Sequence, residues 1–211
     1  MGFSLPLVYP ILDSSYIPTV DRAVYLLRLG RSLADAGVRL MEYRNKVGAD
    51  AEVLADARIL RAAMPQARLI LDDRVDVAMV AGFDGVHVDA GDLPPVDARR
   101  LMGPEAVIGT SAGSEAQLLE GLASPVDYVA FGPVFPTTTK QTSAAPIGIE
   151  GVRRFRAQAG AGALLVAAAG ITLESAQAVL EAGASAVAVS SAIFKRDDPA
   201  AEFRRWISLL G

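Results

Sequence analysis

Eight short apolar runs alternate with amphipathic segments along the chain, and this alternation constrains the fold more than any other feature. The apolar runs span residues 5–13, 39–45, 67–73, 85–89, 106–112, 126–135, 164–170 and 186–193. Helices are predicted near residues 20–36, 50–63, 74–81, 94–102, 114–122, 149–158, 172–182 and 199–210. Such alternation is typical of parallel strands joined by crossover helices. It predicts a compact single-domain (β/α)8 TIM barrel over residues 1–211, with an open doubly wound sheet as the alternative.

Three segments repeat one helix-turn-strand pattern, which supports this interpretation. The segments "ADAGVRL", "MVAGFDGVHV" and "LEAGASAVAV" each end a helix with Gly and enter a strand within about three residues, as a glycine C-cap allows. Asp50, Ser114 and Thr172 are the predicted N-caps of the helices that follow them. The pattern therefore predicts both the helix ends and the starts of the next strands.

Charge and composition exclude several classes of function. A net charge of −4 gives no long-range attraction for nucleic acid or for anionic membrane surfaces. The absence of cysteine excludes disulfides, thiolate zinc sites and cysteine nucleophiles. No clean apolar stretch of about 20 residues is present, and the N-terminus lacks the basic region of a signal peptide. We expect a cytoplasmic protein without nucleic-acid or membrane partners; a homodimer is compatible with the sequence.

Unusual polar residues follow the predicted strands, at the end of a barrel where active sites lie. Glu42, Arg44 and Lys46 alternate at the end of the second strand, and Asp72 and Asp73 end the third. The later strands lead to the other members of this set, which are His87, Asp89, Asp92, Ser111, Thr137, Thr139 and Lys140. Lys46 and Lys140 are two of the three lysines in the chain. Their joint placement predicts one functional rim.

Each of these residues also has a purely structural interpretation. Arg44 and Lys46 could form a solvated strand end paired with Glu42, and Asp73 could cap the helix that starts near Arg74. A single histidine in an apolar strand, such as His87, is more often a packed and hydrogen-bonded side chain than a catalyst. These alternatives stay open from the sequence.

The charges at the rim separate into groups with different chemistry. Asp73 and Asp92 supply oxygen ligands of the kind that Mg²⁺ takes when it also binds phosphate. Cations and hydroxyls that could surround a polyanion come from Arg44, Lys46, Thr137, Thr139 and Lys140. The small-residue turns "AAGI" and "VSSAI" suit a second phosphate group. A diphosphate and a monophosphate at one mouth suggest transfer of a group between two phosphorylated substrates.

One stretch of the sequence is especially distinctive: "GPVFPTTTK" followed by "APIGIEG". Other characteristic segments are "YPILD", "YRNK", "LDDRVDVAMVAGFDGVHV", "IGTSAGS" and "VSSAI". In these segments and their order, over nearly the whole chain, the sequence resembles the thiamine phosphate synthase and thiazole tautomerase family. The resemblance implies a Mg²⁺-dependent transferase that joins hydroxymethylpyrimidine diphosphate to a thiazole phosphate with release of pyrophosphate, through a dissociative step.

The resemblance also implies roles for individual residues. Arg44, Lys46 and Lys140 would hold pyrophosphate, Asp73 and Asp92 would hold Mg²⁺, and Ser111 would face the reacting groups. Among these, Ser111, Lys140 and Arg44 are the expected catalytic residues. The expected substrate-binding residues are Glu42 and Asp72 beside the pyrimidine diphosphate, and Thr137, Thr139, Gly170, Ser190 and Ser191 around the thiazole phosphate.

The chain departs from the family pattern at five places. Glu42 stands in place of Gln, Asp72 in place of Asn, the pair Asp89 and Ala90 in place of Gly-Gln, Gly113 in place of His, and Ala169 in place of the first Gly of a Gly-Gly pair. Two of these changes add negative charge beside the proposed diphosphate, which could cost roughly a few kcal/mol of anion binding. A family member that binds phosphate without turnover is therefore an alternative. The tautomerase relies on a His at position 113, so that activity is disfavoured, and a general-base pair for a sugar phosphate isomerase is not identifiable.

Overall fold

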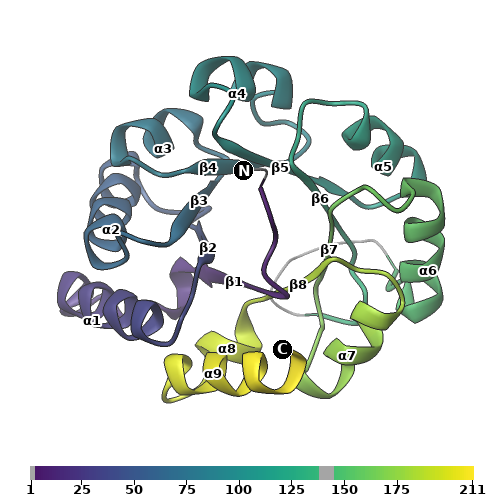
Figure 1. Cartoon of the computed structure of the whole chain (residues 1–211). Coiled ribbons are helices and arrows are strands. Elements are labelled where there is room, and N and C mark those ends of the chain that lie inside the picture. The colour runs from purple at the N-terminus through teal and green to yellow at the C-terminus, as the bar shows by residue number, and fades with distance from the viewer. Residues whose placement is uncertain (1–2, 138–144) are drawn as a thin grey trace.

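The computed structural model, which describes residues 3–137 and 145–211, is a closed barrel of parallel strands surrounded by helices (Figure 1). Each strand pairs with its neighbours in chain order, and β1 closes the ring by pairing with β8. The predicted (β/α)8 fold is thereby confirmed, and the open-sheet alternative is wrong. The strands are β1 (Val8–Asp13), β2 (Leu40–Arg44), β3 (Arg68–Asp72), β4 (Gly85–Val88), β5 (Val107–Ala112), β6 (Tyr128–Phe131), β7 (Leu165–Ala168) and β8 (Ala186–Val189).

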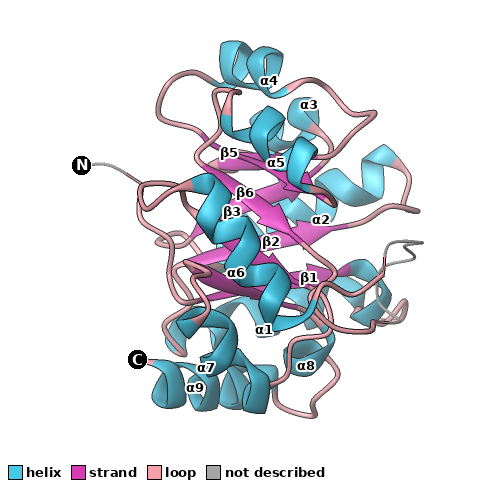
Figure 2. Cartoon of the chain, turned by 90° about the vertical axis from the view of Figure 1, so that its right-hand side faces the viewer, coloured by secondary structure: helices cyan, strands magenta, loops and turns pink. Residues whose placement is uncertain are grey.

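Helices cover the outside of the barrel and alternate with the strands (Figure 2). They are η1 (Ser14–Tyr16), α1 (Arg22–Asp35), α2 (Asp50–Ala63), α3 (Val75–Ala81), α4 (Pro95–Met102), α5 (Glu115–Leu122), α6 (Gly148–Ala159), α7 (Leu173–Glu181), α8 (Ser191–Phe194) and α9 (Pro199–Leu210). None of the helices in the described part of the chain has the length and apolarity needed to cross a membrane.

The predicted helix ends are confirmed at all three repeated turns. Gly37, Gly82 and Gly183 have φ angles of 93°, 71° and 113°, which a residue without Cβ adopts readily. Ser114 caps α5 by accepting from the Gln117 amide, and Thr172 caps α7 in a reciprocal pair with Ser175. The prediction for Asp50 is wrong, because α2 already begins at this residue and Ala49 takes the cap position.

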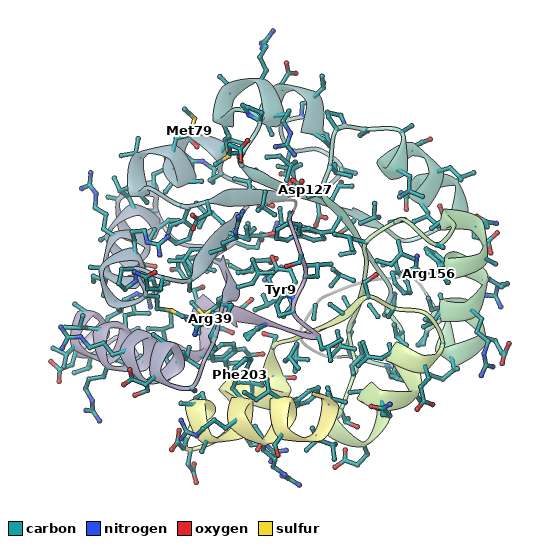
Figure 3. All side chains as sticks on the ribbon, viewed as in Figure 1. Tyr9, Arg39, Met79, Asp127, Arg156 and Phe203 are labelled. Carbon is teal, nitrogen blue, oxygen red and sulfur yellow. The ribbon has the colours of Figure 1, made fainter. Side chains whose placement is uncertain are left out.

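Successive side chains of a strand point to opposite faces of the sheet, so the closed barrel has two apolar layers. One layer lies between the barrel and the helices and contains most of the buried Leu, Val and Phe side chains. The other fills the barrel itself, where Tyr9 and Tyr128 are its largest members and Tyr9 lies at the centre of the ring (Figure 3). Phe3 and Leu5 pack against this inner layer, so the N-terminal segment closes one end of the barrel (Figure 1). Side chains that line a cavity must therefore lie at the other end.

Candidate active site

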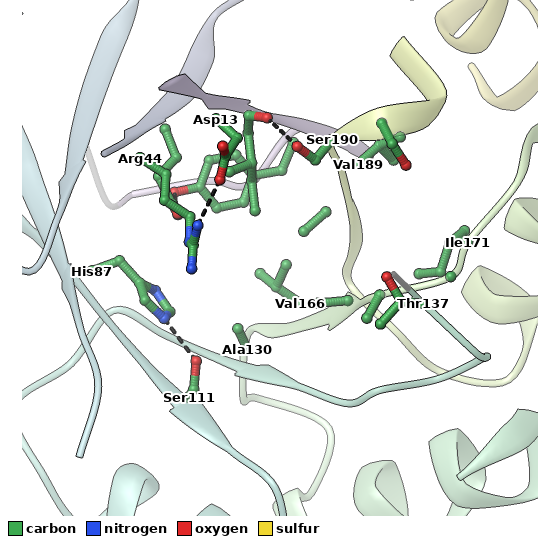
Figure 4. Close-up of a pocket in the computed structure, with 18 of the residues that line it drawn as sticks. Asp13, Arg44, His87, Ser111, Ala130, Thr137, Val166, Ile171, Val189 and Ser190 are labelled. Carbon is green, nitrogen blue, oxygen red and sulfur yellow. Dashed lines mark hydrogen bonds and ion pairs between the residues drawn. The ribbon is translucent and has the colours of Figure 1, made fainter. Parts of the chain in front are cut away.

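A cavity of about 460 Å³ opens among the C-terminal ends of the strands and the loops that follow them (Figure 4). Its two sides differ in chemistry. Strands β1 to β5 contribute the charged and hydrogen-bonding residues Asp13, Glu42, Arg44, Asp72, His87, Asp89 and Ser111. Apart from Tyr128, strands β6 to β8 and their loops contribute small or apolar residues, among them Ala130, Val166, Ala168, Gly170 and Ala188. The cavity thus suits a ligand that has an apolar ring and charged substituents.

Arg44 reaches into the cavity from the end of β2 and is held there by carboxylates on both neighbouring strands (Figure 4). Its Nη1 lies 2.5 Å from Oδ2 of Asp13 on β1, and its Nε lies 3.5 Å from Oδ2 of Asp72 on β3. Burial opposes ionisation of Asp13, but hydrogen bonds from Ser15 and the Arg44 guanidinium lower the pKa of this carboxyl. Arg44 is therefore a fixed cation with a defined direction toward the cavity.

Lys46 lies just outside the cavity in a cluster with the aspartates that end β3. Its Nζ is 2.5 Å from both carboxylate oxygens of Asp73 and 3.0 Å from Oδ2 of Asp72. Asp72 is buried, and burial raises its pKa while Lys46 opposes that rise. The predicted pairing of Arg44 and Lys46 with Glu42 is wrong, because both cations form ion pairs with Asp72 instead. Lys46 itself is exposed, as the solvated-end interpretation predicted.

Asp73 and Asp92 are brought together, as the sequence predicted. Burial raises the pKa of Asp92, and the nearby Asp73 carboxyl raises it further. Oδ2 of Asp92 also accepts the backbone N–H of Asp89 at 2.8 Å. Asp73 has a φ of 64°, and no side chain caps α3, whose N-cap residue is Arg74. The capping interpretation of Asp73 is therefore wrong, and its carboxylate faces the rim.

Two adjacent carboxylates are a suitable donor set for Mg²⁺. Within residues 3–137 and 145–211, no group of three or more His, Cys, Asp or Glu side chains could enclose a metal ion. Mg²⁺ commonly binds through one or two carboxylates and keeps its other positions for water and substrate phosphates. The mutual repulsion of Asp73 and Asp92 is what such a cation would relieve, so the residues fit this metal.

A chain of buried polar side chains forms the floor of the cavity. Tyr9 donates from its hydroxyl to Oε2 of Glu42 at 3.0 Å and lies 2.9 Å from the Tyr128 hydroxyl. Nδ1 of His87 is 3.1 Å from the Tyr128 hydroxyl, and its Nε2 is 2.8 Å from Oγ of Ser111. The interpretation of His87 as a packed, hydrogen-bonded side chain is confirmed.

Burial and neighbouring charges together set the pKa values of the floor residues. Burial raises the pKa of Glu42 to about 7, with the negative charges of Asp72 and Asp89 adding to the rise. Burial alone would lower the pKa of His87, but Asp89 and Glu42 outweigh it and raise this pKa. Burial also raises the pKa of both Tyr9 and Tyr128, so these phenols stay protonated.

The small-residue side of the cavity is built by the turns after β7 and β8. Gly170 has a φ of 71°, and a Cβ at this residue would lie 2.6 Å from the backbone of Phe135 and of Pro136. Ser190 donates its hydroxyl to the Ile11 carbonyl at 2.7 Å, and Ser191 begins α8. The predicted strand 186–193 therefore ends at Val189, and its last residues form α8 from Ser191 onward.

Most of the predicted site residues are gathered at this end of the barrel. The cavity is lined by Glu42, Arg44, Asp72, Ser111, Thr137, Gly170, Ser190 and Ser191, and its rim carries Lys46, Asp73 and Asp92. Thr139 and Lys140 lie outside the described residues. Gly113 follows β5 and donates its backbone N–H to Gln117 rather than lining the cavity.

Sequence reasoning did not assign site roles to Tyr9, Asp13 or Tyr128, which also line the cavity. Asp13 ends β1 as Asp72 ends β3, so its place at a strand end was a usable signal. Tyr9 and Tyr128 carried no such signal, because an aromatic residue within an apolar strand is normally core.

Comparison with known proteins agrees with this geometry. A family model described as thiamine monophosphate synthase matches residues 8–193. The chain belongs to this family. It is therefore an enzyme of the transferase class, and its cavity lies where barrel enzymes hold their substrates.

Individual members of the thiamine monophosphate synthase family match nearly the full length of the chain. A thiamine-phosphate synthase from Koribacter versatilis is 40% identical over 189 residues and is covered to 89%, as is this chain. A thiamine-phosphate synthase from Chloroflexus aurantiacus is 38% identical over 206 residues, which cover 95% of this chain and 94% of the relative. The solved thiamine phosphate pyrophosphorylase from Pyrococcus furiosus superposes with a TM-score of 0.82 at 28% identity, over 96% of this chain and 94% of that chain.

Proposed function

We propose that the chain joins hydroxymethylpyrimidine diphosphate to a thiazole phosphate, giving thiamine phosphate and pyrophosphate. Its relatives named thiamine-phosphate synthase span nearly the whole chain, and its cavity has one charged and one apolar side. The observation that carries the proposal is the position of Lys46, Asp73 and Asp92 beside a cavity into which Arg44 reaches. This arrangement suits a diphosphate at the rim and an organic ring inside.

The proposed reaction exchanges one bond for another without a proton transfer. The C–O bond between the pyrimidine methylene and the diphosphate breaks, and its electron pair leaves with pyrophosphate. The lone pair of the thiazole nitrogen then forms the new C–N bond to the methylene. In a dissociative step the main barrier is the charge that develops on the leaving group, so fixed cations contribute more than a general base. Arg44, Lys46 and Lys140 are the proposed cations.

Asp73 and Asp92 are the proposed holders of Mg²⁺. When bound, this ion would supply positive charge to the leaving diphosphate. Asp73 already binds Lys46, so the lysine and the carboxylate pair would meet the diphosphate together. Ser111, which forms part of the cavity wall, would contact an oxygen of the reacting groups.

The remaining substrate contacts follow from the two sides of the cavity. Glu42 would hydrogen-bond the pyrimidine edge from the floor, beside Asp72. The thiazole phosphate would lie on the small-residue side, against the backbone of Gly170, Ser190 and Ser191. Thr137 and Thr139 would hold the same phosphate from the segment after β6.

A product assay with matched variants tests this function. Purified protein incubated with both substrates and Mg²⁺ should form thiamine phosphate, and chelation of the metal should abolish the product. Asp73→Ala should lower kcat/KM by about 100-fold or more, as expected for loss of a group that stabilises developing charge. Asp76→Ala is its control, because Asp76 lies on α3 and pairs with Arg74 instead. Absence of product from the unmodified protein would contradict the synthase.

The same assay tests Lys140, for which the chain offers a matched lysine. Lys140→Ala should lower turnover by a similar factor, because one cation near the leaving group is lost. Lys195→Ala should leave turnover unchanged, since Lys195 lies over the ring of Tyr16 rather than in the cavity lining. Equal activity of the two variants would remove Lys140 from the proposed mechanism.

A binding protein without turnover is the second candidate, and the excess of acid in the cavity favours it. Asp13, Glu42, Asp72 and Asp89 line the cavity, whereas Arg44 is the one arginine or lysine among the described lining residues. Such a protein would bind thiazole phosphate saturably in calorimetry and form no product. Measured turnover would eliminate this candidate.

A further inference from the structure

The floor of the cavity contains an unbroken series of hydrogen bonds that connects strands β2, β1, β6, β4 and β5. It runs from Glu42 to Tyr9, Tyr128, His87 and Ser111, with contacts of 3.0, 2.9, 3.1 and 2.8 Å. Figure 4 shows the last of these contacts, between His87 and Ser111, at the edge of the cavity. We call these five residues the floor chain. All five members contribute to the cavity lining.

The interior of the floor chain is closed to solvent and tightly fitted. Tyr9 and Tyr128 are each 1% exposed, and their rings meet edge to face. Gly109 leaves room for the Tyr128 ring, since a Cβ at this position would lie 2.1 Å from Cζ of Tyr128. Water therefore has little access to the middle hydroxyls, and each must find its hydrogen-bond partner within the chain.

The middle members can each donate one hydrogen bond and accept another. A phenol hydroxyl has both capacities, and a neutral imidazole carries hydrogen on one nitrogen and a lone pair on the other. The direction of every bond in the floor chain is therefore set by its ends. Glu42 is the end that can change, because a carboxylate only accepts and a carboxylic acid can donate.

With Glu42 ionised, all bonds point toward it. Tyr9 donates to Glu42, Tyr128 donates to Tyr9, and Nδ1–H of His87 donates to Tyr128. Nε2 of His87 then bears a lone pair and accepts the hydroxyl of Ser111. In this arrangement Ser111 presents only lone pairs to the cavity.

With Glu42 protonated, all bonds can point the other way. Glu42 donates to Tyr9, Tyr9 to Tyr128, and Tyr128 to Nδ1 of His87. Nε2 then carries the hydrogen and donates to Oγ of Ser111, whose own hydroxyl is released toward the cavity. The two arrangements differ by one proton, which is taken up from solvent.

We infer that Tyr9 and Tyr128 are positioning residues that connect Glu42 to Ser111, so that a proton taken up at Glu42 turns the Ser111 hydroxyl into a hydrogen-bond donor toward the cavity. The inference deepens the proposed function and rests on it for one point, the nature of the ligand. That ligand is a phosphate or diphosphate oxygen, which needs donors.

The surroundings of Glu42 favour proton uptake near neutral pH. Burial raises its pKa to about 7, and the acidic groups facing it are Asp72 on β3 and Asp89 on β4. His87 and the cation Arg44 oppose this effect, and the phenols of Tyr9 and Tyr128 complete the set of titratable neighbours. Oδ1 of Asp89 lies 3.4 Å from Nε2 of His87, where its charge favours a hydrogen on that nitrogen.

The tautomer of His87 reports the direction of the floor chain, and it can be measured without any ligand. His87 is the only histidine of the protein, so its ¹⁵N side-chain resonances need no assignment. We expect hydrogen on Nδ1 alone at about pH 9 and hydrogen on Nε2 at about pH 6. Because Asp89 and Glu42 raise the pKa of His87, the deciding observation at the lower pH is the hydrogen on Nε2, whether or not Nδ1 also keeps its hydrogen. The same state of Nε2 at both pH values would overturn the inference.

Variants separate the floor chain from general effects of mutation. Tyr9→Phe interrupts the chain, and Glu42→Gln removes the titrating group, so each should abolish the pH-dependent change of tautomer. Tyr43→Phe is the control: its buried hydroxyl donates to Asp56 at 2.5 Å outside the floor chain, and this variant should keep the change. If Tyr9→Phe does not fold, Glu42→Gln provides the same test.

The measurement also distinguishes this inference from the synthase. A protein that makes no thiamine phosphate but shows the tautomer change, and loses it in Tyr9→Phe, would contradict the proposed function and support the floor chain. An active synthase in which His87 of Tyr9→Phe titrates as it does in the unmodified protein would support the proposed function and contradict the floor chain.

Discussion

At the scale of single residues, Glu42 places an ionisable carboxyl where few compensating groups are available. Arg44, the nearest arginine along β2, is already bound by Asp13 and Asp72. Burial therefore dominates and raises the pKa of Glu42 to about 7. A neutral carboxylic acid has both a hydrogen-bond donor and an acceptor, as an amide does, and can hydrogen-bond the edge of a heterocyclic ring in the same way.

This pKa shift predicts that Glu42 makes the unfolding free energy of the protein depend on pH. Its pKa rises from 4.5 to about 7 on folding, so the folded protein binds more protons between these values. The stabilisation is complete below about pH 4.5 and is lost as the pH rises through about 7. Relative to Glu42→Gln, the unmodified protein should lose up to roughly 3 kcal/mol of unfolding free energy between about pH 5 and about pH 8.

Urea unfolding of both proteins across this pH range measures the difference. Glu115→Gln is the control, since Glu115 lies at the exposed start of α5 and shows no comparable burial. A constant difference between the unmodified protein and Glu42→Gln at all pH values would show that Glu42 has the same protonation in both states.

Residue chemistry explains which parts of the site the sequence could predict. Asp73, Asp92 and Lys46 were recognisable because charged residues at strand ends have few structural reasons to occur together. Tyr9 and Tyr128 were not, since their hydrogen-bond partners, such as Glu42 and His87, lie more than 30 residues away in the sequence. Only the closed ring brings those strands into contact across its interior.

At the scale of elements, the turn after β7 is fitted against the segment that follows β6. Val134 and Phe135 donate backbone N–H groups to the carbonyls of Ala168 and Ala169 at 3.0 and 3.1 Å. Ala169 has a φ of 71°, which costs an L-residue with a Cβ about 1–2 kcal/mol. Sequence periodicity predicted β7 itself, but its last residues adopt this turn instead of extended backbone.

Substitutions at the two neighbouring residues of this turn should have opposite effects. Gly170→Ala places a Cβ 2.6 Å from the backbone of Phe135, so it should lower the unfolding free energy by about 1–3 kcal/mol. It should also raise KM for the thiazole phosphate by displacing the segment that leads to Thr137. Ala169→Gly relieves backbone strain and should be neutral or stabilise by up to about 1 kcal/mol.

Thermal unfolding and steady-state kinetics of the two variants compare these effects directly. The kinetic part rests on the proposed function, whereas the stability part does not. Equal stability of Gly170→Ala and the unmodified protein would mean that the turn relaxes away from Phe135 without cost.

At the scale of the whole molecule, one polar device recurs before β4, β6 and β8. A polar side chain just before one of these strands accepts a backbone N–H from the start of the preceding strand and an arginine from the helix that leads into that preceding strand. Asp84 does so for Leu69 and Arg61, and Asp127 for Ile108 and Arg99. Ser185 does the same for Leu165 and Arg156. This repeat ties successive pairs of βα units together at the end of the barrel away from the cavity.

The repeat was only partly visible in the sequence. The glycine turns before β4 and β8 were predicted, and each is followed within two residues by Asp84 or Ser185. The arginines lie 20 or more residues earlier, so their pairing depends on the ring geometry. Strand order could be inferred from the alternation of elements, whereas closure depends on such contacts across neighbouring units.

The device predicts that its copies contribute independently to stability. Asp127→Ala leaves the Ile108 N–H without its acceptor and removes the carboxylate partner of Arg99, at contacts that are both 2.7 Å, so it should lower the unfolding free energy by about 1–3 kcal/mol. Asp84→Ala should have a similar cost, because Leu69 and Arg61 lose the same kind of partner. The two copies share no partners, so the effects of the two substitutions should add within about 0.5 kcal/mol in the double variant.

Chemical denaturation of the single and double variants measures this additivity. Asp97→Ala on α4 is the control and is expected to change the unfolding free energy by less than about 0.5 kcal/mol. A double variant much less destabilised than the sum would mean that one broken copy already loosens the ring around the other, and the barrel would then depend on the repeat as a single unit.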